Sequence, residues 1–331
     1  MKIVVLGAGG WGIALALKSF FKGNETYIWS PFEKEVSSLN EKRESEKLLP
    51  GVKIPEEIKI TSDISVCENA DITVIATPSF AVRETAARLK NINCGIVVNV
   101  AKGFEKGSML RLSEVIKSEL PQADVAVLSG PSHAEEVSRN VPTAIVAASE
   151  NETAAKTVQA AFTGENFRVY TNRDIIGVEV GGAVKNVIAV AAGIEHGLSL
   201  GDNTRAALIT RGLTEMSRLG VAMGADVKTF MGLAALGDLV VTCMSEHSRN
   251  NRFGNLVGRG VPVAEALEKV GTVEGYYAVA AVCELAEKYG VSMPISEQCY
   301  DILYNGTPPM KAVVALMMRP ERSEEETIDI K

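Results

Sequence analysis

The chain has 331 residues and a formal net charge of −7 from 34 basic and 41 acidic side chains. Hydrophobic residues make up 46% of it, which excludes an intrinsically disordered protein and allows a sizeable core. The acidic balance argues against a nucleic-acid partner, which would require a basic surface. At about 150 residues per domain, the length indicates about two domains.

Cysteine and histidine placement gives no metal or disulfide pattern. The five cysteines form no C-x-x-C pair and the three histidines lie far apart, so we expect reduced thiols and no metal site. The first apolar run is too short for a signal peptide, and we expect no stretch to approach the length of a membrane span. These features predict a cytoplasmic protein.

The first twelve residues, MKIVVLGAGGWG, predict a dinucleotide-binding site. Residues 2–6 form a β-branched run suited to one buried strand, and residues 7–12 fit G-x-G-x-x-G before a run of helix formers. Gly7 permits a tight turn, Gly9 lets the backbone approach a pyrophosphate, and Gly12 lets the helix pack closely on the strand. The N–H groups at the start of that helix would then face the diphosphate.

Strand and helix patterns alternate through the first half of the chain. Further strands are expected at residues 25–29, 71–76, 95–100, 125–129, 143–148 and 167–170, and helices at 81–89 and 109–120. The charged segment 41–57 is expected to be a surface loop. Such alternation predicts an α/β, doubly wound, Rossmann-like domain over residues 1–176, with a mostly parallel sheet and ligands beyond the carboxyl ends of its strands.

The pattern changes from about residue 174, where helical periodicity replaces strand periodicity. Helices are expected at residues 177–194, 204–223, 227–236, 263–267, 276–289 and 293–303. This predicts an all-α C-terminal domain over residues 177–331. By analogy with other helical domains appended to a Rossmann domain, it would carry substrate residues and the contact of a homodimer.

Two lone charges in apolar segments are the first candidates for chemistry. Lys185 is the one charged side chain in residues 180–194, and Asp238 is the one charged side chain in residues 230–245. A lysine in this setting either extends its ammonium to water or is buried with a lowered pKa, which suits it to proton transfer. A lone aspartate either caps a helix or pairs with a base. A Lys185–Asp238 pair would satisfy both groups, and the sequence leaves that contact a hypothesis.

Basic residues elsewhere suit an anionic substrate. Lys102 lies just after the carboxyl end of a predicted strand. Its ammonium group there could either contact a ligand or be solvated at the surface. Residues 248–252, SRNNR, offer two guanidinium groups suited to phosphate, although without other evidence an ordinary polar loop before the next helix is the preferred interpretation.

Several stretches together resemble one enzyme family over nearly the whole chain. They are GAGGWG at 7–12, AKG at 101–103, SGPSHAEEV at 129–137, PTA at 142–144, GVEVGGAVKNVIAVAAGI at 177–194, NTRAALITRGLTEMSRLG at 203–220, GLAALGDLVVTC at 232–243, SRNNRFG at 248–254 and VEGY at 273–276. This combination is similar to the bacterial type of NAD(P)-dependent glycerol-3-phosphate dehydrogenase.

The resemblance implies reversible reduction of dihydroxyacetone phosphate to sn-glycerol 3-phosphate by hydride from NAD(P)H, supplying glycerophospholipid synthesis. It implies Lys185 as general acid and base with Asp238 alongside, Lys102 in contact with both substrate and nicotinamide, and Thr242 as a substrate neighbour. The remaining substrate contacts that it implies are Gly130, Ser132, Ser248, Arg249 and Asn250. The remaining cofactor contacts are Gly10, Trp11, Ala134, Arg249 and Glu274.

Ser30 departs from the family pattern after the second predicted strand. An acidic residue there would bind the ribose hydroxyls of NAD, and an arginine would accept the 2′-phosphate of NADP. Ser30 is neither, the arginine often seen in this loop of the family is absent, and Lys34 could compensate. NADH and NADPH both stay open, with a slight lean to NADP.

Two other functions compete with this prediction. Another Rossmann dehydrogenase could act on a hydroxy acid or a 3-hydroxyacyl-CoA, although the histidines form no His–Glu motif of the latter kind. A non-catalytic dinucleotide sensor would have no need for Lys185, Asp238 and Arg249.

Overall fold

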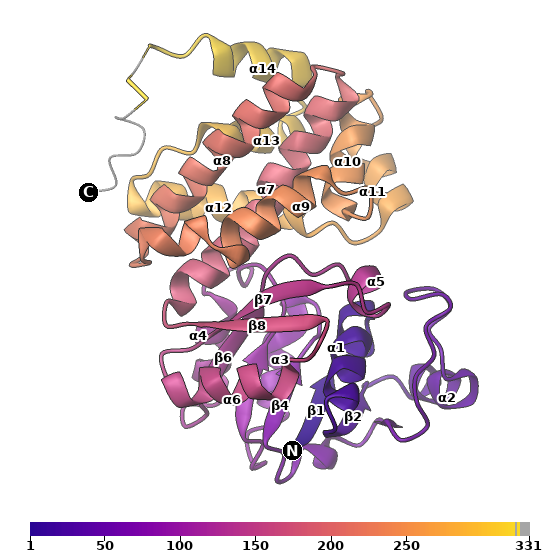
Figure 1. Ribbon diagram of the computed structural model, residues 1–331. Coiled ribbons are helices and arrows are strands. Elements are labelled where there is room, and N and C mark those ends of the chain that lie inside the picture. The colour runs from indigo at the N-terminus through magenta and orange to yellow at the C-terminus, as the bar shows by residue number, and fades with distance from the viewer. Residues whose placement is uncertain (322, 325–331) are drawn as a thin grey trace. The chain divides into compact units, whose positions relative to one another are not determined.

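The computed structural model describes residues 1–321, 323 and 324, and its chain forms two compact units (Figure 1). The first contains residues 1–101 and 110–175; the second contains residues 102–109 and the chain from residue 176 onward. The boundary predicted from the sequence assigns residues 102–109 to the first domain. The structure places them in the second unit, because Lys102 pairs with Asp238 and Phe104 packs in the helical core.

The first unit is built on one eight-stranded sheet in the order β3-β2-β1-β4-β5-β6-β7-β8. The strands are β1 (Lys2–Leu6), β2 (Glu25–Trp29), β3 (Lys59–Thr61), β4 (Ile72–Ile75), β5 (Ile96–Asn99), β6 (Val125–Ser129), β7 (Thr143–Ala148) and β8 (Phe167–Asn172). Neighbouring strands are parallel except β6 and β7, which are antiparallel, so the predicted mostly parallel sheet is confirmed. The three-residue β3 is a strand that the sequence pattern does not predict.

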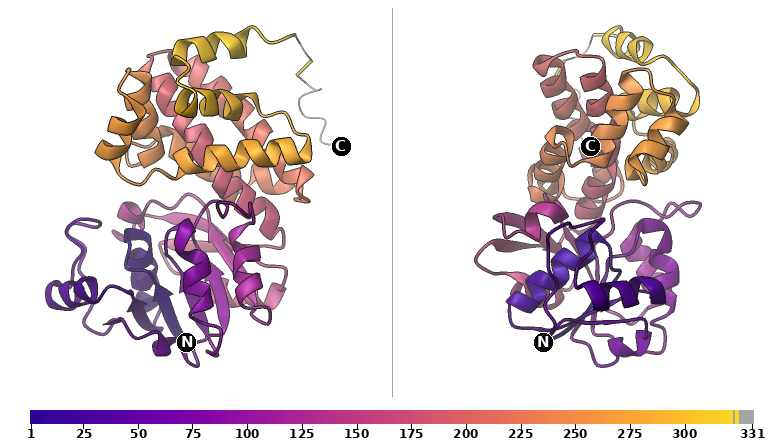
Figure 2. Two further views of the ribbon diagram at one scale, coloured as in Figure 1. Left: turned by 180° about the vertical axis from the view of Figure 1, so that it is seen from behind. Right: turned by 90° about the vertical axis from the view of Figure 1, so that its right-hand side faces the viewer.

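Alternate residues of the central strand β1 enter different cores. Ile3 and Val5 pack with helices α1 (Gly10–Phe21) and α6 (Glu152–Phe162), whereas Val4 and Leu6 pack with α3 (Val82–Ala87) and α4 (Leu112–Glu119). Helices therefore cover both faces of the sheet (Figures 1 and 2). A strand buried on both faces has no polar alternation, which is why the opening apolar run is continuous.

Three helices of the first unit, α2, α5 and α6, escape the sequence prediction. Helix α2 (Glu33–Lys42) buries only two apolar side chains, Val36 and Leu39, so its periodicity is weak. Helix α6 begins after Asn151, whose side-chain oxygen accepts hydrogen bonds from the N–H groups of Thr153 and Ala154. That cap is a recognisable start signal. A four-residue helix, α5 (Ala134–Val137), follows β6.

Every element described in the second unit is helical. Its helices are α7 (Ile175–Gly197), α8 (Asp202–Ala222), α9 (Asp238–Met244), α10 (Arg249–Gly258), α11 (Val263–Val270), α12 (Glu274–Tyr289), α13 (Pro294–Tyr304) and α14 (Pro309–Met317). The helix predicted at 227–236 is instead a 3₁₀ turn (Val227–Met231) and a π-helical turn (Leu233–Gly237), separated by Gly232 in an extended conformation. The α/β domain followed by a helical domain is confirmed.

Helix α7 is the core helix of the second unit. Its 23 residues are long and apolar enough to cross a membrane by length and composition, so the expectation that no stretch approaches that length is wrong. Its most apolar window is 94% buried inside the protein, and α7 residues such as Val184, Val187 and Ile188 lie in the main helical core. Burial against other helices accounts for this composition.

Candidate active site

The turn between β1 and α1 forms a backbone cradle. A Cβ on Gly7, which has a φ of +125°, would lie 2.7 Å from the Ala76 carbonyl oxygen, and a Cβ on Gly12 would lie 2.1 Å from the Gly7 oxygen. A Cβ on Gly9 would instead meet no described atom within 4 Å. Within the described chain, α1 starts without a side-chain cap. Open space at Gly9, beside a helix N-terminus without a side-chain cap, fits the diphosphate of a dinucleotide.

The loop after β6 lies beside this cradle. A Cβ on Gly10 would lie 3.6 Å from the Cβ of Ala134, so the start of α1 meets the start of α5, and Trp11 is half-buried against the same core. Gly130 has a φ of +142°, and the Ser132 hydroxyl donates to its carbonyl oxygen at 2.9 Å. These residues, predicted as substrate and cofactor contacts, all lie in the first unit.

A carboxylate that sequence reasoning missed lies at the end of β2. Ser30 is buried, and its hydroxyl donates to Glu35 Oε2 at 2.5 Å. Glu35 lies on α2, five residues after Ser30, the position at the strand end where an acidic residue is usually sought. A carboxylate here can accept hydrogen bonds from ribose hydroxyls and repel a 2′-phosphate. This contact argues against the slight lean to NADP.

The second unit brings Lys102, Lys185 and Asp238 together. Lys185 Nζ donates to Asp238 Oδ1 at 2.6 Å, and Lys102 Nζ donates to Asp238 Oδ2 at 2.5 Å. The contact that the sequence left as a hypothesis is therefore present. Lys185 is 6% exposed, so the alternative of a lysine that extends to water is wrong. Asp238 is 1% exposed and paired with two ammonium groups, so the alternative of an aspartate that only caps a helix is also wrong.

Burial and charge set the protonation of this cluster. Burial lowers the pKa of Lys185 to about 8, although the charge of Asp238 opposes that shift. Burial alone would raise the pKa of Asp238, but the ammonium groups of Lys102 and Lys185 outweigh it and hold that pKa below its usual value. A lysine with a pKa near neutrality can both give and take a proton, while the carboxylate stays ionised.

Thr242 positions the lysine from one turn further along α9. Its hydroxyl accepts from Lys185 Nζ at 2.7 Å and donates to the Asp238 backbone oxygen at 2.6 Å. Two acceptors therefore hold the Lys185 ammonium, Asp238 Oδ1 and Thr242 Oγ1, which fixes its direction. Thr242, which was expected to lie near the substrate, is therefore hydrogen-bonded directly to the candidate acid, Lys185.

A second hydrogen-bonded chain starts from the residue next to Lys185. Asn186 donates to Glu274 Oε2 at 3.2 Å and accepts from Asn250 Nδ2 at 2.9 Å, while Asn250 Oδ1 accepts from the Gly275 N–H at 2.8 Å. The chain links α7, α10 and α12. Sequence reasoning noted Asn186 only as a neighbouring amide, although a second polar residue inside an apolar helix was an available signal.

Close helix packing makes this chain of amides feasible. A Cβ on Gly193 of α7 would lie 2.1 Å from the Asn251 oxygen, and a Cβ on Gly254 of α10 would lie 2.1 Å from the Val190 oxygen. Glycine therefore lets the two backbones approach closely enough for short amide side chains to meet.

Residues 248–252 start a helix, so the alternative of an ordinary polar loop is wrong. Ser248 caps α10, its buried side chain accepting from the Asn251 N–H at 3.2 Å. Arg249 is the first residue of α10 and is exposed, while Asn250 behind it is buried in the amide chain. A helix N-terminus with an exposed guanidinium suits a phosphate group.

Comparisons with known proteins agree along the chain. Residues 2–155 match the family model for the N-terminus of NAD-dependent glycerol-3-phosphate dehydrogenase, and residues 174–314 match the model for its C-terminus. The chain is 49% identical over 330 residues to glycerol-3-phosphate dehydrogenase [NAD(P)+] of Desulfitobacterium hafniense, covering 99% of this chain and 94% of that protein. It is 47% identical to the enzyme of that name from Bacillus subtilis, covering 99% and 97%. The crystal structure of glycerol-3-phosphate dehydrogenase from Coxiella burnetii matches with a TM-score of 0.92 and 43% identity, covering 96% of this chain and 99% of that one.

Proposed function

The chain belongs to the NAD-dependent glycerol-3-phosphate dehydrogenase family, and we propose that it interconverts dihydroxyacetone phosphate and sn-glycerol 3-phosphate with NADH or NADPH. The first unit would hold the dinucleotide through Gly7, Gly9 and Gly12. The second would hold the substrate and the proton donor. The buried Lys185–Asp238 pair is the observation that carries the proposal, because an apolar helix core has no structural need for an ammonium group.

Lys185 is the proposed acid and base. Hydride for C2 of the ketone comes from the reduced nicotinamide of the bound cofactor, which is the chemistry that the cofactor supplies. As negative charge develops on the ketone oxygen, protonated Lys185 donates a proton to it; in the reverse direction, neutral Lys185 accepts the hydroxyl proton. Asp238 and Thr242 hold the ammonium in place, and Lys102 adds a second positive charge near the reacting oxygen.

The phosphate is proposed to bind at the start of α10. Arg249 would form paired hydrogen bonds to it, with Ser248 and Asn250 beside it. Fixing the phosphate restricts the position of C2 and lowers the entropic part of the barrier. Gly130 and Ser132 are proposed as further substrate contacts. The proposed cofactor contacts beyond the three glycines are Gly10, Trp11, Ser30, Lys102, Ala134, Arg249 and Glu274.

The cellular setting follows from the family and stays a proposal. We propose that the chain works as a cytoplasmic homodimer and supplies glycerol phosphate for glycerophospholipid synthesis. The contact between Ser30 and Glu35 supports a preference for NADH over NADPH.

The test is the initial rate of NADH and NADPH oxidation with dihydroxyacetone phosphate, with unphosphorylated dihydroxyacetone as control. The proposal predicts turnover that depends on the phosphate. A hydroxy-acid or hydroxyacyl substrate oxidised in its place would support the competing dehydrogenase classes, and tight cofactor binding without turnover would support a sensor.

A further inference from the structure

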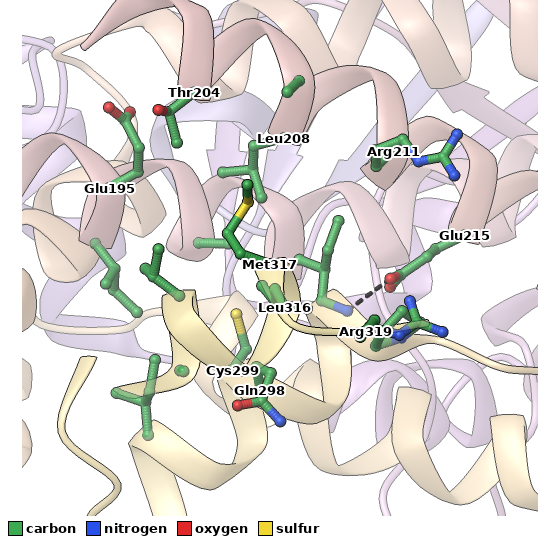
Figure 3. Close-up of a pocket in the computed structure, with 18 of the residues that line it drawn as sticks. Glu195, Thr204, Leu208, Arg211, Glu215, Gln298, Cys299, Leu316, Met317 and Arg319 are labelled. Atoms are coloured by element: carbon green, nitrogen blue, oxygen red, sulfur yellow. Dashed lines mark hydrogen bonds between the residues drawn. The ribbon is translucent and has the colours of Figure 1, made fainter. Parts of the chain in front are cut away.

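The second unit contains a cavity of about 380 Å³ between α7, α8, α13 and α14 (Figure 3). Its wall is mostly apolar, and the buried carboxylate of Glu215 accepts hydrogen bonds from the backbone N–H groups of Ile295 and Ser296. This cavity selects no particular ligand. The first unit, in contrast, contains a set of polar contacts directly beside the proposed cofactor site.

Two walls flank the first residue of α1. A Cβ on Gly10 would lie 3.6 Å from the Cβ of Ala134, at the start of α5. It would also lie 3.7 Å from the Cγ of Leu49 and 3.8 Å from the Cβ of Leu48, which belong to the loop of residues 44–53. Gly10 is a proposed cofactor contact, and the N–H groups at this helix start would face the diphosphate. The positions of α5 and of this loop therefore shape the proposed cofactor site.

The loop of residues 44–53 is closed at its base. Glu44 and Lys53 form an isolated antiparallel bridge, and Lys53 Nζ lies 2.6 Å from Glu44 Oε2 in an ion pair. Just outside them, the Ile54 N–H donates to the Arg43 carbonyl oxygen at 2.8 Å, and Arg43 Nε donates to the Ile54 oxygen at 3.2 Å. These contacts join the two ends of the loop, whereas its tip is held from elsewhere in the first unit.

Arg139 joins the tip of this loop to α5. Its Nη1 donates to the Glu135 carbonyl oxygen of α5 at 2.9 Å, and its Nη2 donates to the Pro50 carbonyl oxygen of the loop at 3.0 Å. One planar guanidinium group therefore spans both walls. Leu49, beside Pro50, is 1% exposed and packs in the same core as Ala134. The apolar contact keeps the tip on the core, and the guanidinium sets its position relative to α5.

We propose that Arg139 is a positioning residue for the dinucleotide: its guanidinium braces the loop 44–53 against α5, so that both walls beside Gly10 are in place before the cofactor binds. This inference rests on the proposed dehydrogenase function, because that function assigns the site at Gly10 to the cofactor. A preorganised wall lowers the ordering cost of binding. Loss of the brace should therefore raise KM for NADH without lowering kcat, since the proposed acid and base, Lys185, belongs to the second unit.

The first test is the Kd for NADH, measured by calorimetric titration of the full chain without substrate. Arg139→Ala should raise this Kd about fivefold. Arg139→Lys keeps the positive charge but cannot reproduce two N–H groups in one rigid plane, so it should bind NADH nearly as weakly as Arg139→Ala. The matched control is Arg168→Ala, which removes an exposed arginine from β8 of the same unit and should leave the Kd unchanged. Wild-type affinity in Arg139→Lys would show an effect of charge alone and overturn the brace.

Backbone hydrogen exchange without cofactor separates positioning from general stability. Exchange in residues 47–51 should be about fivefold faster in Arg139→Ala than in the wild type, while exchange in β1 and α1 stays the same. Faster exchange throughout the first unit, or a lower Tm with an unchanged Kd, would mean that Arg139 only stabilises the fold and would overturn the proposal. A wild-type chain that does not bind NADH would contradict the proposed function as well. If the wild type binds NADH and the Arg139 variants bind it equally well, the brace alone is refuted.

Discussion

Asp238→Asn tests how the buried charges set the chemistry. The substitution keeps the shape of the side chain but removes the one negative charge that contacts both ammonium groups, at 2.5 and 2.6 Å. Burial lowers the pKa of Lys185 to about 8, and the negative charge of Asp238 keeps that pKa from falling further. Without that charge, the pKa of Lys185 should fall by a further ~1–3 units. If both lysines stayed charged, the folded state would lose about 3–5 kcal/mol, so deprotonation of Lys185 is the expected relief.

The assay is kcat/KM for dihydroxyacetone phosphate reduction from acidic through neutral to alkaline pH. Reduction needs protonated Lys185, so the wild-type rate should be highest below the Lys185 pKa of about 8 and fall as pH rises through it. In Asp238→Asn this fall should move to lower pH. Thr242→Val, which removes a neutral partner of Lys185, should lower the rate with a much smaller displacement of the profile. An unmoved profile in Asp238→Asn would refute the assignment of that titration to Lys185.

Two further substitutions test the binding of the substrate phosphate and of the cofactor ribose. Arg249→Ala should raise KM for dihydroxyacetone phosphate at least tenfold, because a charge-assisted hydrogen bond is lost, and should leave any rate with dihydroxyacetone unchanged. The control is Arg252→Ala, which removes an exposed arginine from the same helix. Equal effects of the two substitutions would show that Arg249 does not bind the phosphate. Glu35→Gln should raise the ratio of NADPH to NADH use about tenfold, because the carboxylate on Ser30 no longer repels a 2′-phosphate. Glu33→Gln removes the same charge from an exposed position of α2, so a similar shift there would show a general charge effect instead.

Local pattern was sufficient for most of the fold. The glycines at 7, 9 and 12 were predicted from spacing, and the structure explains the first and last by backbone contacts that leave no room for a Cβ. The α2 helix was missed because only two of its residues are buried, so it has no continuous apolar stripe from which a helical period could be read. The π-helical turn before Asp238 likewise has no simple sequence signature.

The candidate site was predictable where a residue contradicts its local surroundings. Lys185 and Asp238 are charges in apolar helices, so each could be found alone, whereas their contact depends on packing between α7 and α9. Glu35 could not be found in this way. It is one of three acidic residues on a charged helix, and only its contact with Ser30 in the folded chain sets it apart.

The most direct test of the central claim is the comparison of Lys185→Met with the wild type. Methionine keeps the apolar stem and removes the proton donor. If Lys185 is the acid and base, kcat for dihydroxyacetone phosphate should fall on the order of 10²- to 10⁴-fold, while the Kd for NADH, measured on the same folded variant, stays near the wild-type value. Turnover close to that of the wild type, with NADH binding intact, would contradict the account.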